Sequence, residues 1–202
     1  AVFKIRGPRG TEVELLIQHN TGGDPISITI VRDDIKTQSV KFRTLVGGIA
    51  HLKITSFTES TEGELLEALE TFQRRKNRGL ILDLRNNPGG IVDSAVGIAS
   101  QFLDNGLVLY EIDGKGRRKD WKVRDGGLAK EIPMVVIVNG FSASSSEILA
   151  GALMDHQRAM TIGTKTFGKG SVNILYELSD GSGIYITIAR FFTPRGSMIE
   201  GE

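Results

Sequence analysis

The sequence contains no cysteine, and no run of its apolar residues is long enough to cross a bilayer. The missing thiols exclude disulfide scaffolds, cysteine nucleophiles and thiolate metal sites, and a membrane-spanning helix needs about 20 consecutive apolar residues. Net charge is almost absent too, since 25 Lys and Arg oppose 24 Asp and Glu. A chain so balanced lacks both the electrostatic footprint of a general nucleic-acid binder and the basic cluster of a membrane anchor.

Histidine is scarce, whereas glycine is abundant. The three histidines, His19, His51 and His156, lie too far apart in the sequence to predict a metal cluster. We therefore expect neither a metal nor another cofactor. Glycine accounts for 25 of the 202 residues, well above the usual share of about 7%. Without low complexity, this many glycines indicate tight turns and close backbone approaches, of the kind that active-site loops often use.

Residues 1–35 predict a small unit of their own. Two runs of alternating polarity, residues 11–17 and 26–31, flank a glycine-rich turn and predict a β-hairpin. The segment before Gly7 has the pattern of the end of a helix. Because a hairpin with a short piece of helix cannot bury a core by itself, we expect the chain to begin inside a domain.

The rest of the chain, from about residue 36 to residue 202, alternates strand and helix patterns. A polar stretch at residues 111–131 contains the only tryptophan and predicts a β-rich excursion or lid. The alternation predicts an α/β fold with a mixed, largely parallel central sheet and flanking helices. The predicted strands are residues 49–54, 79–84, 134–138, 161–163, 171–178 and 183–191, and the predicted helices are residues 60–76, 91–104 and 144–156.

Two of the predicted strands end in loops that could carry chemistry, because sites in open α/β sheets lie outside the carboxyl ends of the strands. Residues 83–90, DLRNNPGG, end in paired glycines whose amides could form an oxyanion hole, or which could simply make a turn. Residues 139–147, NGFSASSSE, place four serines at a strand-to-helix elbow. Such an elbow exposes the nucleophile of α/β hydrolases, but serines are also good helix caps. The residues alone do not decide between an oxyanion hole and a simple turn in the first loop, or between a nucleophile and helix caps in the second.

A serine nucleophile needs a base, and none of the histidines is well placed to be one. His156 lies at the far end of the helix that the elbow begins, roughly 18 Å along it. His19 belongs to the predicted hairpin, and His51 lies within a strand. This pattern favours a lysine base, the Ser-Lys variant of the same chemistry.

Residues 163–170, GTKTFGKG, supply the lysines Lys165 and Lys169. The segment nearly matches a phosphate-binding loop, but Gly170 stands where a hydroxyl is needed for Mg²⁺. The run that follows also alternates as a strand, whereas bound phosphate requires the start of a helix. The context therefore argues against phosphate binding.

A lysine is protonated at neutral pH unless burial or a neighbouring charge changes this. We expect the apolar side chains of Phe167, Val172 and Ile174 to bury a lysine base in this segment. The absence of acidic residues between positions 165 and 176 also avoids a nearby ion pair.

The motifs at residues 83–90, 142–148 and 163–170 resemble those of the carboxy-terminal processing (tail-specific) serine proteases, in the same order and spacing. Further similarity lies at residues 180–182 and 192–196, so the resemblance covers essentially the whole chain. It implies a crotonase- or ClpP-like peptidase core over residues 36–202, with a β-rich insertion at about 111–131. It also implies that residues 1–35 are the C-terminal part of a PDZ domain, without the loop that captures a terminal carboxylate.

The resemblance assigns roles by position. Ser144 corresponds to the nucleophile and Lys169 to the general base, 25 positions later. The backbone amides of Gly90 and Ser145 correspond to the oxyanion hole. Asn173 stands where the family usually has a glutamine that supports the lysine. Two further residues are expected to lie outside the catalytic set, namely Lys165 and Asp155, the latter aligned with an acid proposed as a third member in some relatives.

The function implied by the resemblance is a serine endopeptidase that cleaves polypeptides near their carboxy termini through a Ser-Lys dyad. It implies polypeptide substrates, no nucleic-acid partner and an exported location. We expect the bacterial periplasm or cell envelope rather than the plastid lumen, with the export signal outside this chain, and leave peripheral membrane association open. The alternative is a non-catalytic ligand-binding module on the same fold, against which the pair Ser144 and Lys169 argues. Esterase or acyl-transfer activity would use the same nucleophile.

Overall fold

A computed structural model describes residues 5–20, 22–33 and 38–200, and the chain divides into two compact units, residues 1–37 and 38–202. In the smaller unit, β1 (Glu12–Ile17) and β2 (Ile26–Val31) form an antiparallel pair. The predicted hairpin is therefore present. The helix end predicted before Gly7 falls mainly on residues 1–4, outside the described residues, and the PDZ assignment stays a prediction.

The larger unit is built around a five-stranded sheet with the order β3-β4-β5-β8-β9. Only β3 is antiparallel to its neighbour, so the sheet is largely parallel, as predicted. The sequence analysis did not identify β3, an edge strand whose exposed Lys41 and Arg43 alternate with apolar residues. The strands are β3 (Val40–Leu45), β4 (Ile49–Ile54), β5 (Gly79–Asp83), β8 (Met134–Val138) and β9 (Met160–Gly163).

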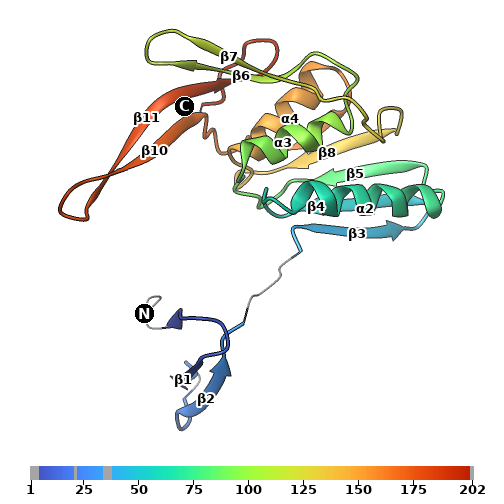
Figure 1. The fold of residues 1–202 in the computed structure, drawn as a ribbon. Helices are drawn as coiled ribbons and strands as arrows, with labels where there is room; N and C mark the ends of the chain where they lie inside the picture. Colours follow the sequence, from blue (N-terminus) through green and yellow to red (C-terminus); the bar gives the residue numbers. More distant parts are fainter. Residues whose placement is uncertain (1–4, 21, 34–37, 201–202) are drawn as a thin grey trace. The chain divides into compact units, whose positions relative to one another are not determined.

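Three helices cover one face of this sheet: α2 (Thr61–Arg74), α3 (Val92–Ser100) and α4 (Ser145–Asp155) (Figure 1). Each lies in the connection between consecutive parallel strands, and right-handed crossovers place such helices on the same side. All three were predicted from the sequence, with predicted bounds wider by one to four residues at each end. Helix α4 follows β8 directly and so presents its N-terminus at the carboxyl edge of the sheet.

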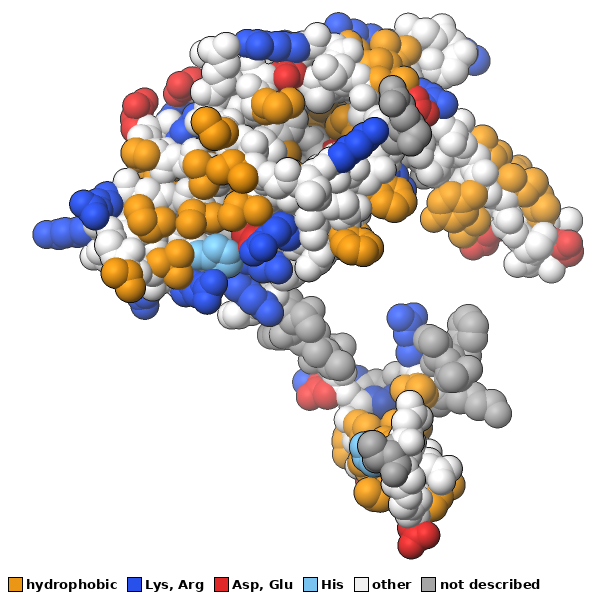
Figure 2. Space-filling view, turned by 180° about the vertical axis from the view of Figure 1, so that it is seen from behind, with side chains coloured by type: hydrophobic (Ala, Val, Ile, Leu, Met, Phe, Trp, Pro, Cys, Tyr) orange, Lys and Arg blue, Asp and Glu red, His pale blue; other side chains and the backbone are white. Residues whose placement is uncertain are grey.

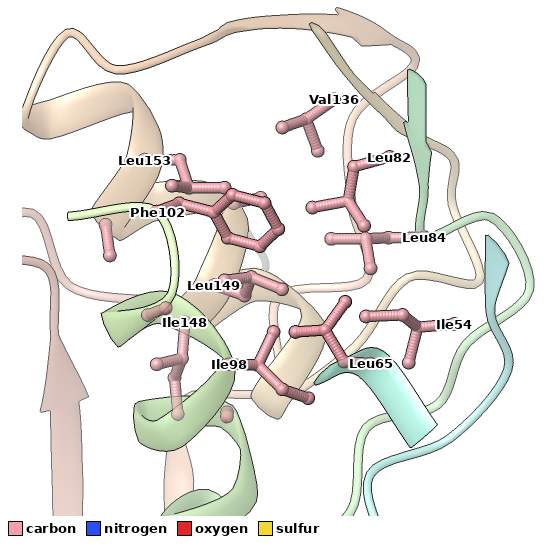
Figure 3. Packing of buried hydrophobic residues seen from close by; sticks show 14 of the residues in the cluster. Ile54, Leu65, Leu82, Leu84, Ile98, Phe102, Val136, Ile148, Leu149 and Leu153 are labelled. Atoms are coloured by element: carbon pink, nitrogen blue, oxygen red, sulfur yellow. The ribbon is translucent and has the colours of Figure 1, made fainter. Parts of the chain in front are cut away.

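The core lies between the sheet and the helices (Figure 3). Leu82 lies near the end of β5 and Leu84 directly follows that strand, and both are fully buried together with Ile98 of α3 and Leu149 of α4. Burying one such side chain stabilises the fold by about 1.5–3 kcal/mol. This packing fixes the start of α4 against the loop that follows β5.

A second sheet of four strands has the order β10-β11-β6-β7, and its strands are antiparallel throughout. The strands are β6 (Leu107–Asp113), β7 (Arg118–Lys122), β10 (Ser171–Glu177) and β11 (Gly183–Phe192). The excursion predicted at 111–131 thus contributes a hairpin that pairs with the last long strand, which the sequence analysis did not foresee. The β10–β11 hairpin projects from the unit, and most of its residues are exposed (Figure 1).

The face of the five-stranded sheet away from the helices is only partly covered. Along β4 and β8, buried residues alternate with half-buried ones, which lie on this second face. The rear view in Figure 2 shows rows of hydrophobic side chains on the larger unit, bordered by Lys and Arg. Within the described residues, no helix is both long and apolar enough to span a bilayer.

Candidate active site

Ser144 lies at the turn between β8 and α4, where it occupies the N-cap position of the helix. Its backbone has φ 54° and ψ −116°. A non-glycine residue in such a region costs about 1–3 kcal/mol and persists only where the surrounding structure imposes it. The sharp turn leaves Ser144 half-buried at the edge of the sheet. This is the geometry of a nucleophile elbow.

Two neighbouring serines are buried and have structural hydrogen bonds. The Ser142 hydroxyl donates to the Leu84 carbonyl at 2.8 Å, and the Ser146 hydroxyl donates to the Asn87 carbonyl at 2.9 Å. Both bonds tie the elbow to the loop that follows β5. The structure therefore separates Ser144 from serines that only hold the turn together.

Glu147, one turn into α4, links the elbow to the lysine segment. One carboxylate oxygen accepts hydrogen bonds from the amide of Ser144 at 2.7 Å and from that of Lys169 at 2.9 Å. The other accepts from the amide of Gly168 at 2.6 Å. Glu147 is 6% exposed. The sequence analysis missed this role, although Ser144 and Glu147 have the spacing of a capping box.

The side chain of Lys169 is exposed, as are those of Phe167 and Ile174, while Val172 is half-buried. The expected burial of the lysine among these three apolar residues is therefore wrong. The physical reason is that Lys169 leads into β10, whose hairpin projects from the unit and is largely exposed. Lys169 instead borders an open hollow.

This hollow has a volume of about 610 Å³ and adjoins the elbow. Its walls are mainly apolar, with Phe141 and Phe167 on the outside at 72% and 61% exposure. It has room for side chains of an extended peptide next to a lysine amine. The lining residues are Asn86, Pro88, Phe141, Ala143, Phe167 and Lys169.

The amides of Gly90 and Ser145, predicted to form an oxyanion hole, lie close together. The Ser145 hydroxyl donates to the Gly90 carbonyl at 2.9 Å. Neither amide N–H has a hydrogen-bond partner within residues 5–20, 22–33 and 38–200. At Gly90, φ is 145° and a Cβ would lie 2.1 Å from the Phe57 carbonyl oxygen, so only glycine fits. Two free donors beside the elbow could bind an oxyanion.

Asp83, at the end of β5, anchors the loop that leads to Gly90. It is fully buried and accepts hydrogen bonds from the Arg85 amide at 3.0 Å, from Arg85 Nε at 2.9 Å and from His51 Nε2 at 3.0 Å. Burial raises the pKa of Asp83, but the hydrogen bonds from Arg85 and His51 outweigh it and hold the pKa far below its usual value. The sequence analysis expected no catalytic role for His51, and its side chain is largely buried against Asp83.

The two loops at the carboxyl edge are also joined by a reciprocal amide pair. Asn139 Oδ1 accepts a hydrogen bond from the Asn86 amide at 3.0 Å, and Asn139 Nδ2 donates to Asn86 Oδ1 at 2.8 Å. Because Asn86 and Asn139 follow different strands, their bonds fix the distance between the glycine loop and the elbow. No motif in the sequence pointed to this pair.

Asn173 is not brought to Lys169 by any hydrogen bond among the described residues. Its amide donates to the Ser171 hydroxyl at 3.1 Å and accepts from the Thr187 hydroxyl at 2.7 Å. A register shift between Val172 and Asn173 re-aims the side chain along the hairpin. The supporting role of Asn173 therefore stays a prediction, without a hydrogen bond to Lys169 among the described residues.

Two further candidates, His156 and Asp155, lie at the far end of α4 from the elbow. His156 is at the C-cap of α4 and bonds the Leu107 carbonyl at 2.7 Å. Asp155 accepts a hydrogen bond from the Arg195 amide at 2.8 Å, and this bond has a structural role. Lys165 is exposed in the loop before Lys169. No group of three potential metal-ligating side chains occurs in the part of the chain that the structure describes.

Comparison with known proteins gives the same family as the motifs. A family model described as "Peptidase family S41" matches residues 48–202. The chain is 41% identical to a carboxy-terminal-processing protease of Bartonella bacilliformis, over 100% of this chain and 47% of that protein. It is 36% identical to the carboxy-terminal processing protease CtpA of Bacillus subtilis, over 98% of this chain and 42% of that protein. The chain thus spans less than half the length of these relatives.

A solved structure agrees with the sequence matches. The photosystem II D1 C-terminal processing protease superposes with a TM-score of 0.75 and 29% identity, over 96% of this chain and 54% of that chain. The mixed α/β fold is therefore shared with a protease of known structure. The resemblance inferred from three motifs is confirmed, and the chain belongs to peptidase family S41.

Proposed function

We propose that this protein is a serine endopeptidase that cleaves polypeptides near their carboxy termini, with Ser144 as nucleophile and Lys169 as general base. One observation carries the assignment of the pair. A single oxygen of Glu147 accepts hydrogen bonds from the backbone amides of both residues, at 2.7 and 2.9 Å. The backbones of these two residues, 25 positions apart in the sequence, thus bind the same carboxylate oxygen, and Lys169 lines the hollow that adjoins the elbow.

The reaction proceeds through an acyl-enzyme. The neutral amine of Lys169 takes the hydroxyl proton of Ser144 while the serine oxygen attacks the carbonyl carbon of the scissile bond. The resulting ammonium returns that proton to the leaving amine as the carbon–nitrogen bond breaks. A water molecule, deprotonated by Lys169, then attacks the ester and releases the new carboxylate with free Ser144.

The amides of Gly90 and Ser145 would stabilise the oxyanion in both steps. Neither N–H group has a hydrogen-bond partner within the described part of the chain, and a donor that is free before substrate binds needs no reorganisation during the reaction. Removing one such donor typically costs about 10²–10³-fold in kcat.

Lys169 must lose its proton to act, although its side chain is exposed in the free protein. A peptide that fills the hollow between Phe141 and Phe167 would displace water from the amine. Loss of hydration disfavours the charged form of a lysine. In this proposal the substrate therefore helps to create the base that cleaves it.

The proposal extends to substrates and location. The named relatives are carboxy-terminal processing proteases, which supports a polypeptide substrate and cleavage near a chain end. We propose an exported location, the bacterial periplasm or cell envelope, which fractionation of cells that express the full-length protein would test. A preference for chain ends is tested by kcat/KM on matched peptides with free and amidated carboxy termini. Equal values would contradict it.

The nucleophile is tested by labelling the full-length protein with a serine-directed phosphonate and mapping the adduct by peptide mass spectrometry. We expect modification at Ser144, and hydrolysis reduced by about 10³-fold or more in Ser144→Ala and Lys169→Ala alike. The double variant should be no worse, since the two residues act as a unit. Lys165→Ala is the matched control and should keep its activity. Labelling at another serine would overturn the assignment of Ser144, whereas the absence of both labelling and hydrolysis in the parent protein would support the ligand-binding alternative.

A further inference from the structure

The carboxylate-bearing residue Glu200 lies directly opposite the proposed base. Lys169 and Glu200 are partners in an antiparallel β-bridge. Side chains of such partners point to the same face, with Cβ atoms about 4.5–5.5 Å apart. The contact is fixed by Gly170, where a Cβ would overlap the Ile199 carbonyl oxygen. A carboxylate in this place could pair with Lys169 and hold it as an ammonium, which cannot accept a proton.

Glu200 is instead paired with Arg190. An ion pair joins Arg190 Nη1 to Glu200 Oε1. Arg190 lies in β11, and the amide of the next residue, Phe191, donates to the Gly170 carbonyl at 2.7 Å. The arginine is therefore held close to the lysine segment. Lys169 has no ion pair with any carboxylate in the described ranges.

The other charged groups on the surrounding elements do not take this role. Glu147 of α4 uses both oxygens to accept backbone amides. Lys165, in the preceding loop, carries the same charge as Lys169. In the loop after β5, Arg85 is bound to the carboxylate of Asp83. Glu200 is thus the carboxylate opposite Lys169, and the side chain of Arg190 is its ion-pair partner.

We propose that Arg190 is a positioning residue that keeps Glu200 away from Lys169, so that Lys169 can lose its proton. The proposal rests on the proposed function, because it takes Lys169 as the general base. It predicts that the charge on Arg190 acts on the reaction through Glu200, although Arg190 does not contact the reacting atoms.

The test is the pH dependence of kcat/KM for the full-length protein and its Arg190→Gln variant. Without Arg190, Glu200 is free to pair with Lys169, and the midpoint of the rising limb should move to higher pH. An opposite charge nearby favours the protonated form of an amine, and solvent exposure weakens this effect. At pH values well below the midpoint, kcat/KM should fall about 3- to 10-fold, whereas the plateau at high pH should be kept.

Further variants show whether Glu200 carries the effect. Arg190→Lys should keep most of the parent profile, and Glu200→Gln should move the midpoint to lower pH. In the Glu200→Gln background, Arg190→Gln should shift the midpoint by less than half of its effect in the parent. The matched control is Arg117→Gln, which breaks a comparable exposed ion pair with Asp113 and should leave the midpoint unchanged.

A second readout does not depend on activity. Competitive acetylation of Lys169 as a function of pH, quantified by peptide mass spectrometry, follows the protonation of its amine. Glu200→Gln should move this curve to lower pH, and an unmoved curve would overturn the proposal even if Arg190→Gln did not fold. An unchanged rate midpoint in a folded Arg190→Gln protein would also overturn it and leave Arg190 a structural role. Hydrolysis that survives Lys169→Ala would overturn both this inference and the proposed function, whereas loss in Lys169→Ala without a shift in Arg190→Gln overturns this inference alone.

Discussion

The carboxylate of Glu147 accepts a hydrogen bond from the backbone amide of Ser144 at 2.7 Å, so the N-cap residue of α4 and the acid in its first turn hold each other in place. A carboxylate is favoured at the N-terminus of a helix, where free amides concentrate partial positive charge. Here the same carboxylate also accepts hydrogen bonds from the backbone amides of Gly168 and Lys169. The start of α4 thereby joins two parts of the chain that the proposed chemistry requires together.

Glu147→Ala is expected to abolish most hydrolysis and to destabilise the fold. It leaves three amides without acceptors, and a buried unsatisfied donor costs about 1–3 kcal/mol. Glu147→Gln keeps one acceptor oxygen and should show a smaller loss of stability. The measurements are kcat/KM and thermal unfolding, with the exposed Glu67→Ala as control. Full activity in Glu147→Ala would show that the link is dispensable.

The serines of the elbow should separate activity from stability. Ser144→Ala should lose hydrolysis while its Tm stays close to that of the parent. Ser142→Ala and Ser146→Ala should keep most of their activity but lose about 1 kcal/mol of stability each, because each removes a buried hydrogen bond. Equal losses of activity in all three variants would mean that the serines serve only to shape the turn.

Gly89→Ala should reduce hydrolysis by more than the strain of its backbone conformation alone would explain. A Cβ at Gly89 would lie 2.8 Å from the Ser144 Cβ and 2.7 Å from the Ala143 carbonyl oxygen. Gly126→Ala is a matched control, since its φ is +90°, close to the +98° of Gly89, and nothing lies within 4 Å. Both variants should lose about 1 kcal/mol from the positive φ, but only Gly89→Ala should lose hydrolysis. Equal activities would show that the elbow tolerates displacement.

Stability should fall in acid because of Asp83. Burial raises its pKa, and the hydrogen bonds from Arg85 and His51 lower it further than burial raises it. A carboxyl group with a depressed pKa in the folded state contributes stability above its unfolded pKa, about 3.9, and loses it as the pH falls further. Asp83→Asn should therefore lower the Tm at neutral pH and flatten its dependence on pH below about 4. The prediction would be refuted if the Tm of Asp83→Asn fell with pH below about 4 as steeply as that of the parent protein.

Asn173→Ala should keep most of the activity, because the amide bonds Ser171 and Thr187 rather than Lys169. The measurement is kcat/KM beside that of Lys169→Ala. A loss as large as that of Lys169→Ala would support the role for Asn173 that the family resemblance implies.

The sequence predicted the parallel sheet well because its strands are short apolar runs with clear ends. The bounds of β4 and β8 coincide with the predicted ones. The four-stranded sheet was not predicted, since β6 and β11 pair across some 80 residues and no local pattern specifies the partner of an alternating strand. Register between distant strands depends on tertiary packing.

The candidate site was likewise predicted only where local sequence patterns specify it. The elbow at Ser144 and the glycine at position 90 are local features, and their loops were identified from residue types and spacing. The exposure of Lys169 was not foreseen, because burial depends on whether another element covers the side chain. The contact between Lys169 and Glu200 was missed as well, since it arises from a turn that returns the chain to the same edge.

The proposed nucleophile and base belong to different sheets. Ser144 follows β8 of the five-stranded sheet, whereas Lys169 precedes β10 of the four-stranded one. The contacts between α4 and β6, including the His156 bond to the Leu107 carbonyl, therefore help to set the alignment of the reacting groups. A misplacement of 1 Å can cost about 10²-fold in rate. The catalytic rate is thus expected to report sensitively on how the two sheets are packed against each other, even for substitutions that lie well outside the hollow.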